Sequence, residues 1–128
     1  MSISIVRLGS PRGPDEGLRI GTVRRPPRGV PKTRFAADDW YDVWFPSLAP
    51  SLETMKLGRA AASVSEWAAF TRRYEKEMSA PDAKRTIELL AALSHTANLS
   101  VGCYCEDEAR CHRSILRRLL EKAGARLA

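Results

Sequence analysis

Hydrophobic residues alternate with polar or small residues in three short stretches, a pattern typical of β-strands. The stretches are residues 3–8, 18–23 and 99–105. The last one places Leu99, Val101, Cys103 and Cys105 on alternate positions. The first two could pair as a hairpin, but the nine-residue connection from Gly9 to Gly17 leaves their relative direction open.

Helical spacing of apolar residues dominates the second half of the chain. One helix is predicted to begin near Ser63, which has capping-box spacing with Glu66. A second is predicted to begin at Pro81. A third has an apolar face that starts at Ile115, and Gly124 is expected to end it. The first of these helices carries an apolar stripe that we expect in the core: Trp67, Phe70, Tyr74 and Met78.

The middle of the chain has weaker signals. Asp38 and Asp39 are predicted to open a short helix that runs through Trp44. Residues 51–57 are expected to add another helical turn or two, closed by Gly58. The small residues 58–62 then read as a connector that could be mobile.

These elements predict an α/β fold, with a few-stranded mixed sheet flanked by helices in a single small domain, residues 1–128. Hydrophobic content of 44% and charged content of 28% describe an ordinary globular protein, and no apolar run is long enough to span a bilayer. Three cysteines clustered within residues 103–111 argue against a secreted disulfide framework. We therefore expect a cytoplasmic protein.

A proline-rich basic loop follows the second strand. Residues 24–34 contain three prolines, which stiffen the segment, and five basic side chains. Arginine meets phosphate or carboxylate through two parallel hydrogen bonds, so Arg24 and Arg28 are candidates for anion binding. The net charge of +6 agrees with an anionic partner. The alternative, about equally favoured, is a solvated linker or an address-like basic patch.

The most chemically suggestive stretch comes at the start of the last helix. Cys111, His112 and Arg113 fall near its first turn, where free backbone N–H groups attract anions. A cation there opposes the helix dipole, and a bound anion would remove that conflict. The slightly favoured alternative is that Arg113 pairs with a nearby carboxylate. The candidates are Glu106, Asp107 and Glu108.

The same stretch offers nucleophiles. Cys111 is the best thiolate candidate, because a helix N-terminus and neighbouring cations lower the pKa of a thiol. Cys105 is the second candidate nucleophile, and Glu106 or His112 would transfer the proton. The plainer interpretation is that the cysteines and His112 are packed in the core, where free cysteine usually lies.

A zinc site of the form C-x-C-x5-C-H is a minor alternative. Structural zinc usually takes ligands in spaced pairs on turns, whereas Cys103 lies within the predicted strand, and Cys111 and His112 are adjacent. Convergence of all four side chains on one metal would need distortion, so no metal is assigned. A disulfide between Cys105 and Cys111 is sterically allowed.

Two motifs carry a resemblance to a known family. Arg24-x-x-Pro27-Arg28-Gly29 and the ending Cys105-Glu106-x5-Cys111-His112-Arg113 resemble the YeaO-like family, domain of unknown function 488. That resemblance implies a compact α/β domain and no settled activity or cofactor. Where the YeaO-like pattern tends to read Asp-Arg-x-Trp-Pro-Arg-Gly, this chain lacks both the acid and the tryptophan.

Two functional hypotheses follow from the sequence. The first is a small enzyme or ligand-binding domain for an anionic small molecule, phosphorylated or nucleotide-like, held beyond the carboxyl ends of the strands. Its ligand would contact Arg24, Arg28 and Arg113. The second is a non-enzymatic basic module that binds nucleic acid or a protein. The basic loop lacks interleaved aromatic residues for base stacking, which places the second hypothesis behind the first. The sequence leaves the oligomeric state open.

Overall fold

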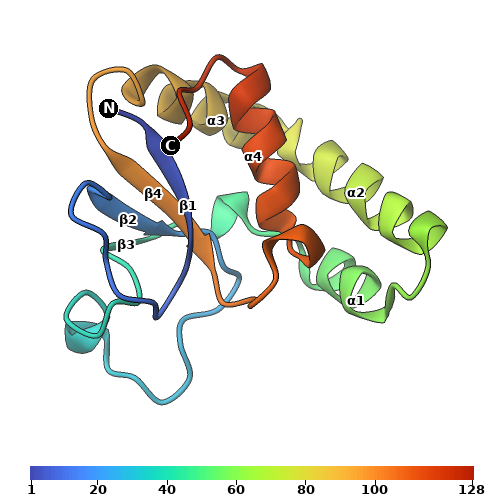
Figure 1. Ribbon diagram of the computed structural model, residues 1–128. Helices are drawn as coiled ribbons and strands as arrows, with labels where there is room; N and C mark the ends of the chain where they lie inside the picture. Colours follow the sequence, from blue (N-terminus) through green and yellow to red (C-terminus); the bar gives the residue numbers. More distant parts are fainter.

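The computed structural model describes residues 1–128 as one α/β unit with a four-stranded sheet (Figure 1). The strands are β1 (Ile3–Arg7), β2 (Leu18–Gly21), β3 (Val43–Trp44) and β4 (Leu99–Cys103). The helices are α1 (Leu52–Ala60), α2 (Val64–Met78), α3 (Pro81–Leu93) and α4 (His112–Lys122). The predicted fold class is confirmed, except that the sheet is parallel throughout and not mixed.

The last strand in the sequence occupies the centre of the sheet, whose order is β1-β4-β2-β3. Ile5 of β1 and Ile20 of β2 both pair with Val101 of β4, one on each side. The hairpin between the first two strands is therefore wrong, because β4 separates them. All four strands run in the same direction, so the segments that leave β1, β2 and β4 emerge at the same edge of the sheet.

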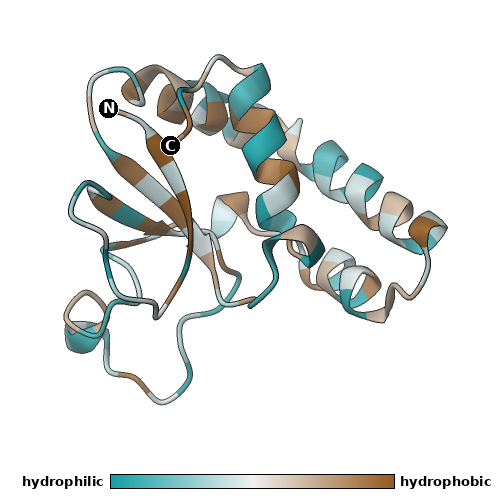
Figure 2. Cartoon of the chain, in the orientation of Figure 1, coloured by the Kyte–Doolittle hydropathy of each residue, from teal (hydrophilic) through white to brown (hydrophobic).

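The four helices gather on one side of the sheet and bury the main core against it (Figure 1). The predicted stripe of α2 lies in this core: Phe70, Tyr74 and Met78 are buried, and Trp67 packs against them. Figure 2 shows hydrophobic stretches along β1 and β4 and an alternation of hydrophobic and hydrophilic residues along α4. None of the helices combines the length and the apolar character needed to cross a membrane.

The other face of the sheet is covered by connecting segments held to a buried arginine. Arg19 of β2 is fully buried and forms a bidentate ion pair with Glu16, with N···O distances of 2.8 Å. Its Nη1 also donates to the backbone carbonyls of Ser10, at 2.9 Å, and Asp39, at 2.7 Å. Arg19 thus ties the β1–β2 connection and the segment before β3 to the sheet.

Two local predictions from the middle of the chain are wrong. Residues 38–44 form no α-helix: Asp39 has a left-handed backbone with φ of 63°, and Val43–Trp44 pairs with β2 as strand β3. The predicted connector at residues 58–62 begins inside α1, which continues to Ala60. A Cβ atom on Gly58 would lie 2.7 Å from the Phe70 ring, so glycine is required here for close packing of α1 on α2.

We expect Arg19→Met to destabilise the protein by about 3–5 kcal/mol, because it leaves Glu16 as an unpaired charge in a buried site. Urea denaturation followed by circular dichroism measures the change. Arg85→Met is the matched control, since Arg85 is exposed on α3, and it should change the free energy of unfolding by less than about 0.5 kcal/mol. Equal effects of the two substitutions would contradict the role given to Arg19.

Candidate functional site

A crevice of about 1040 Å³ opens at the carboxyl edge of the sheet. Its walls include the segments that follow three strands: Arg7–Ser10 after β1, Val23–Arg28 after β2 and Cys103–Cys105 at the end of β4. Helices α1 and α2 close the opposite side with residues such as Met55 and Trp67. This is the position at which open parallel sheets place their ligands.

The crevice is strongly cationic. None of the residues that line it is an aspartate or a glutamate, whereas seven are basic: Arg7, Arg24, Arg25, Arg28, Lys56, Arg59 and Arg110. With no carboxylate among them, their charges add to a positive potential that attracts anions.

Some of these basic groups are already engaged by the protein. Arg24 donates to the carbonyls of Pro50 and Ala49, at 3.2 and 3.0 Å. Arg110 donates to the Ala61 carbonyl and stacks on the Trp67 ring with its guanidinium carbon 4.8 Å from the centroid. Four basic side chains make no hydrogen bond or ion pair with the protein and are free to meet a ligand: Arg25, Arg28, Lys56 and Arg59.

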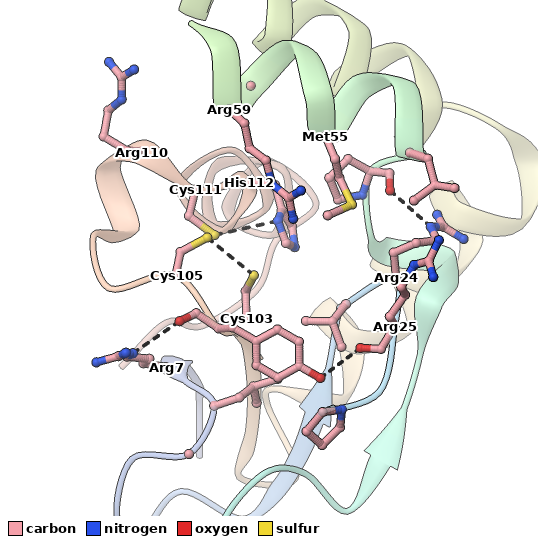
Figure 3. A pocket seen from close by; sticks show the side chains of 18 of the residues that line it. Arg7, Arg24, Arg25, Met55, Arg59, Cys103, Cys105, Arg110, Cys111 and His112 are labelled. Atoms are coloured by element: carbon pink, nitrogen blue, oxygen red, sulfur yellow. Dashed lines mark hydrogen bonds between the residues drawn. The ribbon is translucent and has the colours of Figure 1, made fainter. Parts of the chain in front are cut away.

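Three sulfur atoms and an imidazole lie together at the base of the crevice (Figure 3). The Cys103 and Cys105 Sγ atoms are 3.8 Å apart, and Cys111 Sγ is 3.7 Å from His112 Nδ1. Cys103 and Cys111 are buried, whereas Cys105 is exposed. Their positions follow from the end of β4 and the start of α4, where Cys111 is the N-cap residue.

The contacts among the three sulfurs shift the pKa values of their thiols in different directions. Hydrogen bonding from Cys103, and then from Cys111, lowers the pKa of Cys105 well below that of an ordinary thiol, and the charges of Arg113 and Arg59 add to this effect. The contacts with Cys105 and Cys111, together with burial, raise the pKa of Cys103. The contact with Cys103 lowers the pKa of Cys111, and the neighbouring imidazole of His112 contributes in the same direction. The exposed Cys105 is therefore the favoured thiolate.

The orientation of His112 is fixed by the backbone of the segment after β2. Its Nε2 lies 2.8 Å from the Thr22 carbonyl oxygen, which can only accept, so Nε2 carries the proton. In the neutral ring the lone pair is then on Nδ1, which faces the Cys111 sulfur. The ring also meets Tyr74 edge-on, with centroids 5.4 Å apart. His112 is buried and hydrogen-bonded, and its Nδ1 is the face that it presents to the sulfurs.

Arg113 lies outside the crevice. It is only 3% exposed, and it donates from Nη1 to the Val6 carbonyl, at 2.7 Å, and from Nη2 to the Cys105 carbonyl, at 2.6 Å. It forms no ion pair with the acidic loop, because Glu106 faces Arg7 at 3.6 Å and Glu108 pairs with Arg117 at 2.7 Å. The expected pairing of Arg113 with one of those carboxylates is therefore wrong. The guanidinium instead joins the end of β1 to the loop that carries Cys105.

The structure brings most of the predicted site residues together in one crevice: Arg24, Arg28, Cys105, Cys111 and His112. Glu106 and Arg113 are not among its lining residues. Sequence reasoning missed Lys56 and Arg59, whose spacing of three residues places both on one face of α1. That spacing was the available signal, but the helix was expected to end at Gly58, before Arg59.

The exposure of the three cysteines predicts the order in which they react. We expect iodoacetamide to alkylate Cys105 first, and Cys103 and Cys111 much more slowly, because the latter two are 7% and 3% exposed. Peptide mass spectrometry over a time course measures the three rates. In denaturant the rates should become similar. Equal rates in the native protein would contradict the separation of exposed and buried sulfurs.

Comparison with known proteins gives one match. A family model described as the active DUF488-N3 subclade matches residues 3–124, which is nearly the whole chain and includes both the basic loop and the Cys-His-Arg segment. No curated protein and no solved structure matches the chain.

Proposed function

The chain belongs to the DUF488 family, and from this premise we propose that it is a small enzyme for an anionic, phosphorylated or nucleotide-like small molecule bound in the cationic crevice. The observation that carries the proposal is the lining of that crevice, in which seven basic side chains and three cysteines occur without a carboxylate. The matching subclade is described as active, which agrees with an enzyme.

The anion would be bound by basic side chains that make no hydrogen bond with the protein and lie on opposite walls of the crevice. Arg28 belongs to the loop after β2 and Arg59 to α1, so an anion between them meets guanidinium groups from two separate elements. Each guanidinium can hold two oxygens of a phosphate at once. The volume of about 1040 Å³ matches the upper range of ligand pockets and leaves room for a group the size of a nucleotide.

Chemistry would fall to Cys105. It is the exposed sulfur of the cluster, and the positive charges of Arg113 and Arg59 stabilise its thiolate, which is the nucleophilic form of cysteine. Cys111 and His112 lie buried beneath it, so we assign them to the support of Cys105 and not to direct attack. Glu106 faces Arg7 outside the crevice, which makes it the weakest of the sequence-derived candidates for proton transfer.

We expect inorganic phosphate or a nucleoside diphosphate to raise the melting temperature of the wild-type protein, and Arg28→Ala and Arg59→Ala each to remove most of that rise. Each substitution deletes one bidentate contact, worth about 1.5–3 kcal/mol for a hydrogen bond to a charged group. Differential scanning fluorimetry measures the shifts. Arg85→Ala, on the exposed face of α3, is the control and should respond like the wild type. An anion-induced shift that survives both substitutions would overturn the proposed binding site.

A second candidate function, binding of single-stranded nucleic acid, gains support from aromatic residues near the basic loop. Tyr104 donates its hydroxyl to the Arg25 carbonyl at 2.9 Å, and Trp40 meets the Tyr104 ring edge-on with centroids 5.8 Å apart. The fold thus supplies next to Arg25 the aromatic rings that the loop sequence itself lacks. Rings beside cations are what base stacking and backbone contacts require.

This alternative predicts binding to unrelated single-stranded oligonucleotides that weakens steeply as salt is raised. Fluorescence anisotropy measures it, and Tyr104→Leu should weaken binding by roughly 5- to 150-fold, the equivalent of about 1–3 kcal/mol for a lost stacking contact. Binding of free nucleotides without any binding of oligonucleotides at low salt would exclude the alternative and retain the enzyme.

A further inference from the structure

The buried part of the sulfur cluster has the composition of a metal site. Cys103 Sγ, Cys111 Sγ and a ring nitrogen of His112 all lie within 4.8 Å of one another, and all three residues are buried. They come from two elements that meet at the base of the crevice, the end of β4 and the start of α4. Two thiolates and an imidazole form a donor set that favours zinc over harder cations such as magnesium or calcium.

The spacing of the donor atoms is near that of tetrahedral zinc. With Zn–S near 2.3 Å and Zn–N near 2.0 Å, a tetrahedral site has an S···N edge of about 3.5 Å and an S···S edge of about 3.8 Å. Cys111 Sγ and His112 Nδ1 are 3.7 Å apart, close to the first value. The donor atoms of the three residues lie within 4.8 Å of one another, and this limit exceeds the tetrahedral S···S edge by about 1 Å. Metal binding would therefore draw the donor atoms closer together.

The imidazole is oriented as a metal-bound histidine usually is. Nε2–H is held by the Thr22 carbonyl at 2.8 Å, which fixes the ring and leaves the Nδ1 lone pair free on the side of the sulfurs. A hydrogen bond from the second ring nitrogen to a carbonyl is the usual outer contact of zinc-ligating histidine. The sequence spacing indicated that all four donors would need distortion to reach one metal, and only three of them converge: Cys103 is the final residue of β4, and Cys111 has an extended backbone beside His112.

We propose that Cys103, Cys111 and His112 bind a zinc ion whose fourth coordination position faces the crevice. Cys105 does not belong to the group of mutually close donors, although its sulfur lies 3.8 Å from that of Cys103. Three protein ligands with an open position are the arrangement of catalytic zinc sites, whereas structural sites are closed by four. The open position lies where the basic side chains would bring an anionic ligand. The metal site stands independently of the proposed function, because its ligands and its test involve no substrate.

The test is metal content and cobalt spectroscopy on the full chain. We expect the purified protein to carry one zinc ion per chain, measured by mass spectrometry of the metals, and the chelated protein to take up Co²⁺ with sulfur-to-cobalt charge-transfer bands and tetrahedral visible bands. Cys111→Ser and His112→Gln should each abolish stoichiometric binding. His95→Gln is the matched control: this histidine contacts the Gly124 carbonyl, away from the cluster, and its loss should leave the metal in place.

Substitution of Cys105 distinguishes a zinc site with three protein ligands and an open position from a site that Cys105 closes as the fourth ligand. Cys105→Ser should retain one metal per chain, and its loss of metal would overturn the open position. If the folded wild-type protein binds neither zinc nor cobalt through its thiolates, the proposed metal site is wrong. This outcome is measured on the wild-type protein, so it does not depend on whether a variant folds. Cobalt bands without any stabilisation by phosphate or nucleotides would reject the proposed function and keep the metal site.

Discussion

The insertion of β4 between β1 and β2, with all strands parallel, is the constraint on which the remaining structure depends. Parallel neighbours end at the same edge, so segments separated by about eighty residues of sequence are brought to one crevice. The basic loop after β2 and the cysteines at the end of β4 line the same crevice only because of this pairing. A hairpin of β1 and β2 would have sent their exits to opposite edges and left the sulfurs without their cationic surroundings.

Loops alone cover the carboxyl edge of the sheet and the face that has no helices. Two buried arginines hold these loops in place by donating hydrogen bonds to backbone carbonyls. Arg19 binds the carbonyls of Ser10 and Asp39, and Arg113 binds those of Val6 and Cys105. A guanidinium has five N–H donors and can satisfy several backbone carbonyls that no helix or strand would pair. The sequence pointed to Arg113 as a contact for a ligand or a nearby carboxylate, yet its guanidinium holds backbone carbonyls, as that of Arg19 does. Arg19 is also neutralised by Glu16, whereas the charge of Arg113 acts on the Cys105 sulfur.

Sequence patterns predicted the helices and strands that have strong periodicity. They failed for elements and side chains whose structure depends on tertiary contacts. The α2 stripe, the capping of Ser63 and the end of α4 at Gly124 were all visible, because each depends on local spacing or on a single backbone requirement. Strand β3 was missed because two residues carry no periodicity, and the acids before it resembled a helix start. The crevice was predicted as a meeting of Arg24 and Arg28 with Arg113 and the helix start at Cys111; the lining includes Arg24, Arg28 and Cys111 but not Arg113. Arg59 was missed because the helix was expected to end at Gly58, and the burial of Arg113 was not predictable, since it depends on the packing of α4.

The central position of β4 also has a consequence for how the protein forms. Strands β1 and β2 do not pair with each other; each pairs with β4. A nascent chain that has not yet reached Leu99 therefore exposes the edges of β1 and β2 that β4 later covers. The last residues add to this closure, because Leu127 bridges to Ile3. Contacts of such long sequence separation make folding slow and leave incomplete chains open to aggregation. The sulfur cluster is therefore assembled at the end of synthesis, because its cysteines lie at residues 103–111 and meet the loop after β2 only once β4 has paired with β2.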